Sequence, residues 1–258
     1  MTARTPNLAV LIDADNASAR HASAIFEEVA RLGEANVRRI YGDFSTGRLK
    51  GWDAATRALA ILEQQSRCNT TGKNASDIAL VIDAMDLMHT AKLDGVCLVS
   101  SDSDFTRLAQ RLREHGLVVY GFGERKTPET FRAACNRFIY VENLAEGAEV
   151  APVADVAQAL DAAPPAAPEA PPEPPRRDPP ARAVPVLVKA MLGAEDEDGW
   201  VALSAVGHRA QAIAPDFDTR SFGCAKLSDL ARKSGAFELK GSGSSLMMRL
   251  TPLVRPKK

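Results

Sequence analysis

The stretch Leu8-Ala9-Val10-Leu11-Ile12-Asp13 is a short, unbroken apolar run that ends in an aspartate. Residues 17–32 follow with apolar positions at helical spacing and stop at Gly33, so the pattern predicts a strand and then a helix. A strand that is apolar at every position is typical of a parallel sheet with two buried faces. The chain therefore opens with a strand of a sheet that helices cover.

The same alternation continues to about residue 141. Further strands are predicted at 37–41, 95–99, 117–122 and 138–141, and further helices at 51–65, 76–90, 105–115 and 127–135. In the helix over 76–90, the apolar stripe is predicted to carry Ile78, Val81, Ile82 and Met85. Alternating strands and helices imply an α/β fold, a parallel sheet sandwiched by helices, in which ligands bind beyond the carboxyl ends of the strands.

Alanine and proline dominate residues 151–183, as in Pro171-Pro172-Glu173-Pro174-Pro175. Proline removes amide donors and fixes φ, so this stretch predicts an extended linker. The linker separates a domain over residues 1–150 from a second domain over residues 184–258. In the second domain, helical patterns near 186–192, 201–213 and 221–233 precede two strand patterns joined by Gly241-Ser242-Gly243-Ser244, which indicates a small winged-helix-like domain.

The composition excludes several classes of protein. Lysine plus arginine (32) nearly balances aspartate plus glutamate (33), so any surface that binds nucleic acid must be local. Cys68, Cys97, Cys135 and Cys224 lack the close spacing of a zinc site, and buried, reduced thiols are expected. No apolar run approaches the roughly 20 residues that span a bilayer, and residues 1–7 lack a signal pattern. We therefore expect a cytoplasmic protein without a membrane partner.

Acidic side chains follow two of the predicted strands and open one helix. Asp13 comes directly after the first strand, and Asp102 and Asp104 come after the strand at 95–99. Asp77 lies in the first turn of the helix over 76–90, where it can face the same edge of the sheet. Two carboxylates at ~4 Å repel by about 4 kcal/mol at an effective dielectric constant near 20. Either some of these groups are protonated, or a divalent cation lies among them.

Oxygen ligands without histidine or cysteine favour Mg²⁺ or Mn²⁺ over zinc. Such an ion can polarise a phosphate oxygen and lower the pKa of a bound water, so the pattern predicts phosphodiester hydrolysis. Asp77 or Asp104 could instead serve only as helix caps, because aspartate is common at helix starts. Asp83 lies six residues after Asp77, too far around the helix to share its direction well, and the role of Asp15 is open.

Three motifs in the first domain resemble those of NYN-domain proteins of the LabA type, which are relatives of PIN-domain ribonucleases. They are LIDADN at 11–16, KNASD at 73–77 and VSSDSDF at 99–105, and the resemblance covers about residues 7–144. It implies a PIN-like fold in which the four aspartates named above are catalytic metal ligands. It also implies that Asn16 and Ser101 line the substrate site.

Basic residues lie in loops near the same edge, where binding groups are common. Those that could hold an RNA backbone are Arg48, Lys50, Lys73, Arg125 and Lys126. Because the net charge is near zero, each could equally be an ordinary solvated charge.

Two motifs in the second domain resemble an OST-HTH/LOTUS domain. They are GWVALS at 199–204 and FGCAKLSDL at 222–230, within a resemblance that spans about residues 184–250. The resemblance implies a module that binds RNA or docks a protein partner. Lys226 and Lys233 could contact phosphates through counterion release. The aromatic residues of this module are predicted to form its core rather than to stack on bases: Trp200, Phe217, Phe222 and Phe237.

The function predicted from these patterns is a metal-dependent ribonuclease with a C-terminal RNA-binding module. Two alternatives stay open. A non-catalytic RNA-binding or scaffold protein would keep the fold without the chemistry. A phosphatase of the haloacid dehalogenase type also carries Asp-x-Asp after its first strand, but Ala17 stands where that family expects threonine or valine, and the short loops leave no cap insertion.

Overall fold

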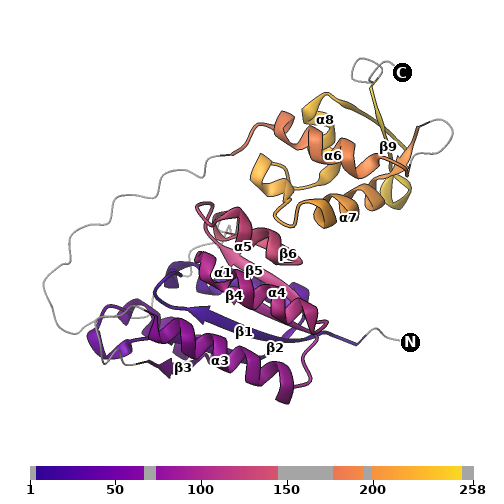
Figure 1. Ribbon diagram of the computed structural model, residues 1–258. Coiled ribbons are helices and arrows are strands. Elements are labelled where there is room, and N and C mark those ends of the chain that lie inside the picture. Colours follow the sequence, from indigo (N-terminus) through magenta and orange to yellow (C-terminus); the bar gives the residue numbers. More distant parts are fainter. Residues whose placement is uncertain (1–3, 67–73, 145–176, 195–198, 252–258) are drawn as a thin grey trace, which may run out of the picture.

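The computed structural model describes residues 4–66, 74–144, 177–194 and 199–251. Its larger part is a six-stranded sheet with the order β3-β2-β1-β4-β5-β6, in which every neighbouring pair is parallel (Figure 1). The α/β fold with a parallel sheet is confirmed. Its strands are β1 (Asn7–Asp13), β2 (Glu34–Gly42), β3 (Leu62–Gln65), β4 (Gly95–Val99), β5 (Val118–Gly123) and β6 (Arg137–Tyr140).

The strand order reverses between β1 and β4. The chain steps outward from β1 to β2 and β3 on one side, and from β4 to β5 and β6 on the other. Ligands of such sheets bind beyond the carboxyl ends of the strands at this switch point. Asp13 is the last residue of β1, and Ser100 directly follows β4, so both residues lie at the place where this topology puts a site.

Helices cover both faces of the sheet. On one face, α1 (Ala22–Leu32) packs against Val10 and Ile12. On the other face, α3 (Ala75–Thr90), α4 (Thr106–Glu114) and α5 (Glu129–Ala134) share a core with Ala9 and Leu11. Alternate side chains of β1 thus enter two buried cores, which explains why its sequence is apolar from Leu8 to Ile12. Short helical turns join these elements: η1 (Ala19–His21), η2 (Phe44–Thr46), η4 (Ser103–Phe105) and η5 (Val141–Asn143).

The prediction of one helix over residues 51–65 is wrong. The segment forms the turn η3 (Lys50–Trp52), the short helix α2 (Asp53–Ala58) and then β3, which pairs with β2. After α2, Ala60 adopts a left-handed conformation with φ 50°, and the Ile61 N–H donates to the carbonyl of Thr56 at 2.9 Å. This hydrogen bond is that of a Schellman ending, usually made with glycine. After this turn the chain enters β3, the strand at the edge of the sheet.

The predicted apolar stripe of α3 is confirmed only for Val81 and Met85, which pack against the core. Ile78 and Ile82 are each 58% exposed, whereas Leu80, Ala84 and Leu87 are buried. Residues 80, 84 and 87 repeat at helical spacing and face the sheet, while residues 78 and 82 lie on the opposite side of the helix. Because α3 carries apolar residues on both sides, the sequence pattern alone did not select the buried one.

The C-terminal module has its own core. Three helices, α6 (Val184–Met191), α7 (Leu203–Ile213) and α8 (Leu227–Ser234), pack beside an antiparallel sheet of the order β7-β9-β8. This arrangement confirms the small winged-helix-like domain. The predicted third helix near 221–233 is in fact the turn η8 (Thr219–Phe222) followed by α8. The strands are β7 (Val201–Ala202), β8 (Phe237–Lys240) and β9 (Met247–Leu250), and the turn η9 (Gly243–Ser245) connects β8 to β9.

The aromatic residues of the module divide between its core and its surface. Phe217 and Phe237 are buried, and Phe222 packs against Phe217 with ring centroids 6.0 Å apart. Trp200 is half-buried, and the Arg249 guanidinium lies 4.5 Å from its ring centroid. The predicted core is therefore confirmed for the phenylalanines.

The three cysteines of the described residues, Cys97, Cys135 and Cys224, are buried free thiols, as expected. Cys68 lies outside the described residues. Burial raises the pKa of the Cys135 thiol to about 12, so it stays protonated at neutral pH. In the described part of the chain, none of the helices combines the length and the apolar character needed to cross a membrane.

Candidate active site

Asp13 ends β1 inside the protein, where it is 1% exposed. Its Oδ2 accepts hydrogen bonds from Ser100 Oγ at 2.7 Å and from Asn16 Nδ2 at 2.9 Å. Its Oδ1 accepts from the backbone amides of Asp15 at 3.2 Å and Asn16 at 3.3 Å. Burial raises the pKa of the Asp13 carboxyl, and these hydrogen bonds oppose the rise. The carboxylate is held in one orientation at the switch point of the sheet.

Ser100 links the ends of β1 and β4. Its hydroxyl donates to Asp13, and the same oxygen accepts from the backbone amide of Asp102 at 3.0 Å. Ser100 is 2% exposed, so neither hydrogen bond competes with solvent. Ser100 was not predicted as a site residue, although its hydroxyl directly after a buried strand could have indicated this role. The predicted substrate residue Ser101 instead accepts from the backbone amide of Glu124 at 2.9 Å.

Gly123 lets β5 end close to Ser100. A Cβ atom at Gly123 would lie 2.6 Å from the carbonyl oxygen of Ser100 and 2.8 Å from Thr127 Oγ1. The Ser100 backbone amide also donates to the Phe122 carbonyl at 2.9 Å. The close approach requires glycine, because a larger residue would push the Ser100 segment outward.

Asp102 and Asp104 follow β4 and face solvent more than Asp13 does. Asp102 precedes the turn η4, and its Oδ1 accepts from the backbone amide of Asp104 at 2.9 Å. Asp102 therefore caps this turn, a role the sequence analysis considered for its neighbour Asp104. Asp102 is half-buried, and Asp104 is exposed. A capping role and a ligand role are compatible, because a carboxylate has about four acceptor sites.

The pKa of Asp77 is affected by the other four aspartates at this edge of the sheet. Asp77 lies in the first turn of α3, and the pKa of its carboxyl is raised to about 6, with burial as the largest cause. The negative charges of Asp13, Asp102, Asp104 and Asp15 add to this rise. These four charges come from the ends of β1 and β4, so the structure brings together the four predicted aspartates from three separate segments of the chain.

Asp15 joins the cluster to two further segments. Its Oδ1 pairs with Arg48 at 3.5 Å, and its Oδ2 accepts from Ser76 Oγ at 3.4 Å. Asp83 does not belong to the cluster: its carboxylate accepts hydrogen bonds from Arg39 and from the Tyr41 hydroxyl. Asp83 thus ties α3 to β2, which agrees with its expected direction away from Asp77.

The donor chemistry of the cluster fits a hard divalent cation. Within the described ranges, no group of three or more histidine, cysteine, aspartate or glutamate side chains is already spaced to hold a metal ion. The side chains at this edge nevertheless offer only oxygen atoms, the donors that Mg²⁺ and Mn²⁺ prefer. The pKa of Asp77 is raised first by burial and then by the negative excess of charge from four neighbouring carboxylates. A bound cation would offset that excess.

The basic residues predicted to hold a phosphate backbone lie in different surroundings. Arg48 and Lys50 are exposed in the loop beside Asp15, and Lys73 lies outside the described residues. Arg125 bonds Asn143 Oδ1 at 3.2 Å and pairs with Asp178, while Lys126 pairs with Glu124 at 2.9 Å. In the C-terminal module, Lys226 is exposed before α8, and Lys233 donates to the carbonyl of Gly223 at 3.2 Å. Of these residues, only Arg48 forms an ion pair with a member of the acidic cluster among the contacts of the described residues.

Two domain families match the chain. Residues 7–142 match the NYN domain, and residues 177–247 match the OST-HTH/LOTUS domain. A crystal structure of a protein of unknown function from Vibrio parahaemolyticus is similar to 54% of this chain and to 95% of that chain, at 18% sequence identity and a TM-score of 0.47. No curated protein matches the chain.

The NYN domain is part of the PIN-like nuclease superfamily, whose nucleases generally use divalent metal ions, and OST-HTH/LOTUS domains bind RNA. The NYN match covers more than half of the 258 residues, in the part of the chain that forms the parallel sheet and the acidic cluster. The chain therefore belongs to the NYN-domain family, with an OST-HTH/LOTUS domain following the NYN domain.

Proposed function

We propose that the protein is a metal-dependent ribonuclease that hydrolyses RNA phosphodiester bonds at the acidic cluster. The observation that carries this proposal is the convergence of carboxylates from three segments of the chain. Ser100 Oγ lies 2.7 Å from Asp13 Oδ2 and 3.0 Å from the Asp102 amide, and burial and four neighbouring carboxylates raise the pKa of Asp77 to about 6. A cluster of negative charge at the switch point of a parallel sheet is costly unless a cation binds there. Family membership supports the same conclusion, because PIN-like nucleases generally use divalent metals.

The proposed metal ligands are Asp13, Asp77, Asp102 and Asp104, and the proposed ion is Mg²⁺ or Mn²⁺. When bound, the ion would polarise a phosphate oxygen and lower the pKa of the attacking water. Ser100 positions Asp13 and the Asp102 backbone through its two hydrogen bonds, at 2.7 and 3.0 Å.

Around the ligands, Asn16 donates to Oδ2 of Asp13, and its proposed role is to contact substrate. The proposed role of Arg48 and Lys50 is to attract the RNA backbone, which their exposure in the loop next to Asp15 supports. Ser101 supports the loop at Glu124 through the hydrogen bond to its hydroxyl.

We further propose that the NYN domain occupies residues 1–150, that residues 151–183 form the linker, and that the C-terminal module binds the same RNA. Lys226 and Lys233 are exposed on that module and available to phosphates. Two observations favour a module boundary slightly before residue 184. Ala183 is fully buried in the core of the module, and the Asp178 backbone amide donates to the carbonyl of Ser221 at 2.9 Å.

A cutting assay on the full chain tests the proposal. Single-stranded RNA is incubated with Mn²⁺ or with EDTA, and the wild type is compared with Asp102→Asn and with Asp86→Asn. Asp86 is exposed on α3 and lies nine residues after Asp77, about 13 Å along the helix at roughly 1.5 Å per residue, so it is the matched control. We expect Mn²⁺-dependent cutting by the wild type and Asp86→Asn, and loss of cutting by Asp102→Asn.

The other outcomes separate the alternatives. RNA binding without cutting by the wild type and Asp86→Asn would support the alternative of a non-catalytic RNA-binding protein. Hydrolysis of a generic phosphate monoester without RNA cutting would support the phosphatase, which the family match already disfavours. Equal cutting by the wild type and Asp102→Asn would place the activity outside this site.

A further inference from the structure

The C-terminal module contacts the outer edge of the NYN sheet (Figure 1). The Phe138 backbone amide of β6 donates to the carbonyl of Pro215 at 2.9 Å, so the module covers part of an edge that would otherwise expose unpaired amides. Asn143 Nδ2 donates to Ser221 Oγ at 2.9 Å, and Asp216 accepts from Arg132 and from the Tyr140 hydroxyl. The two modules are therefore joined by specific polar contacts.

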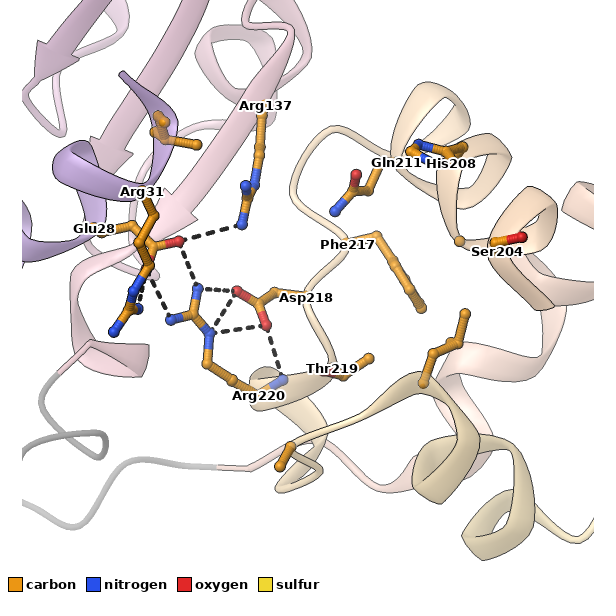
Figure 2. Close-up of a pocket in the computed structure, with 14 residues that line it drawn as sticks. Glu28, Arg31, Arg137, Ser204, His208, Gln211, Phe217, Asp218, Thr219 and Arg220 are labelled. Atoms are coloured by element: carbon orange, nitrogen blue, oxygen red, sulfur yellow. Dashed lines mark hydrogen bonds and ion pairs between the residues drawn. The ribbon is translucent and has the colours of Figure 1, made fainter. Parts of the chain in front are cut away.

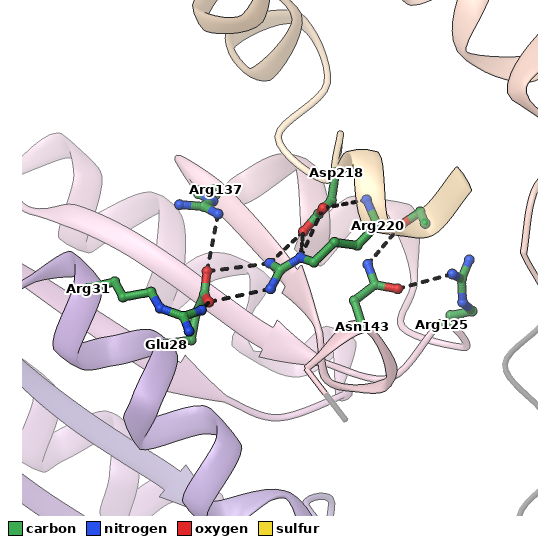
Figure 3. A network of polar contacts seen from close by, with 8 residues as sticks. Glu28, Arg31, Arg125, Arg137, Asn143, Asp218 and Arg220 are labelled. Carbon is green, nitrogen blue, oxygen red and sulfur yellow. Dashed lines mark hydrogen bonds and ion pairs between the residues drawn. The ribbon is translucent and has the colours of Figure 1, made fainter. Parts of the chain in front are cut away.

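At this junction, three arginines surround one buried carboxylate. Glu28 of α1 is 4% exposed, and it pairs with Arg31 at 2.8 Å, Arg137 at 3.3 Å and Arg220 at 3.4 Å (Figure 3). Asp218 pairs with Arg220 at 2.7 Å. Three positive charges thus meet two negative charges, and the cluster keeps one positive charge in excess.

A cleft of about 570 Å³ opens beside this cluster, between the two modules (Figure 2). Its volume lies within the range of pockets that hold small ligands, roughly 300–1,000 Å³. One wall carries Arg31 and Arg137. The opposite wall carries Ser204, His208 and Gln211 of α7, whose spacing of four and three residues puts them on one face of that helix.

The two walls together offer hydrogen-bond donors and positive charge. A guanidinium has five N–H donors, and within the described residues the side chains of Arg31 and Arg137 each bond only to Glu28. Their remaining donors, together with the hydroxyl of Ser204 and the amide of Gln211, are the groups that bind phosphate oxygens.

The cleft is separate from the acidic cluster. Arg137 is the first residue of β6 and Arg31 lies in the last turn of α1, so the cleft lies toward the amino-terminal edge of the sheet. Asp13 lies at the carboxyl end of β1, which has seven residues. A strand of that length spans about 20 Å, at roughly 3.3 Å per residue. The two sites are therefore at opposite ends of the sheet.

We propose that this cleft binds the phosphate backbone of the RNA, so that the two modules hold one strand jointly at a distance from the cut. The proposal rests on the proposed function only in naming RNA as the ligand. It assigns Arg31 and Arg137 of the NYN domain and Gln211 of the C-terminal module to the same phosphate-binding surface.

The test measures binding of labelled oligouridine to the full chain in EDTA, so that cutting plays no part. Arg31→Gln removes an attraction, and Gln211→Glu adds a repulsion on the opposite wall. The matched controls are Arg111→Gln and Gln110→Glu on α4, where Arg111 pairs with Glu114 at i+3 just as Arg31 pairs with Glu28 at i−3. Thermal unfolding of all four variants checks that they remain folded.

Each lost phosphate contact should lower the slope of log K against log salt by about 0.7, which corresponds to roughly fivefold weaker binding at about 0.1 M salt. We expect this loss for both cleft variants and for neither control. Wild-type affinity and salt slope in both cleft variants would overturn the proposal. Unchanged RNA binding in both cleft variants, together with inorganic phosphate that raises the unfolding temperature of the wild type but not that of Arg31→Gln, would identify a free anion rather than a strand as the ligand, and would also overturn it.

The result is independent of catalysis. A protein that binds RNA through the cleft but does not cut it would refute the ribonuclease and leave this proposal standing. If the wild type cuts RNA and both cleft variants bind RNA as well as the wild type does, the cleft proposal is refuted and the ribonuclease proposal stands.

Discussion

The acidic cluster and the arginine cluster around Glu28 differ in how their charges are balanced. At the carboxyl edge of the sheet, the charges of four aspartates raise the pKa of Asp77, and Arg48 forms an ion pair with Asp15. At the junction of the modules, three arginines share Glu28 and the charges are nearly balanced. Under the proposed function the first cluster binds a cation from solution, whereas arginines of the chain itself already pair with Glu28 in the second. Removing one carboxylate should therefore have opposite effects at the two places.

The largest effect is expected for Asp77→Asn. It removes a proposed metal ligand, so RNA cutting should fall by more than about 100-fold, beyond the loss typical for residues that only support a ligand. The metal-free variant should unfold at the same or a higher temperature than the wild type, because a repelled charge is gone. Cutting rates and thermal unfolding in EDTA measure both quantities. A less stable metal-free variant would contradict the repulsion.

The reverse is expected for Glu28→Gln at the arginine cluster. Removing the charge of Glu28 leaves Arg31 and Arg137 without their ion-pair partner, while Arg220 keeps Asp218. Because breaking a buried ion pair is costly, the free energy of unfolding should fall by about 3 kcal/mol. Glu27→Gln is the matched control, since Glu27 neighbours Glu28 on α1 but is exposed. Chemical denaturation of both variants gives the comparison. Equal stability of Glu28→Gln and the wild type would mean that the junction does not form in solution.

A smaller effect is expected for Ser100→Ala. Asp13 would lose its hydrogen bond of 2.7 Å, and the Asp102 amide would lose its acceptor. A buried polar group left without its partner costs about 1–3 kcal/mol, so stability should fall within that range. Mn²⁺ affinity should fall as well, because Asp13 is no longer held in place. Ser103→Ala, at an exposed position in the same loop, should change neither quantity.

The smallest effect is expected for the pH dependence of metal binding. The pKa of Asp77 is raised to about 6, so its proton stabilises the metal-free protein below that pH, and this stabilisation is lost as the pH rises through 6. A metal ion competes with the same proton. Mn²⁺ affinity should therefore fall about tenfold per pH unit below about pH 6 and level off above it. Calorimetric titration across this range would contradict the coupling if affinity did not change.

The acidic cluster could be predicted from the sequence because its position depends only on where the strands end. The buried run at 8–12 and the aspartates after it are local signals, and parallel topology brings the ends of β1 and β4 together. β3 was missed because its helix ending uses Ala60 rather than glycine, which removes the usual stop signal. The contacts of Glu28 were beyond reach, since no local pattern relates it to Arg220, which lies 192 residues away in the chain.

Soaking crystals in Mn²⁺ and recording its anomalous scattering would test most directly whether the converging aspartates bind a cation. We predict anomalous density between the carboxylates of Asp13, Asp77, Asp102 and Asp104, and none beside Glu28. Occupied Mn²⁺ sites elsewhere on the protein, with none among these four aspartates, would contradict the proposed metal site.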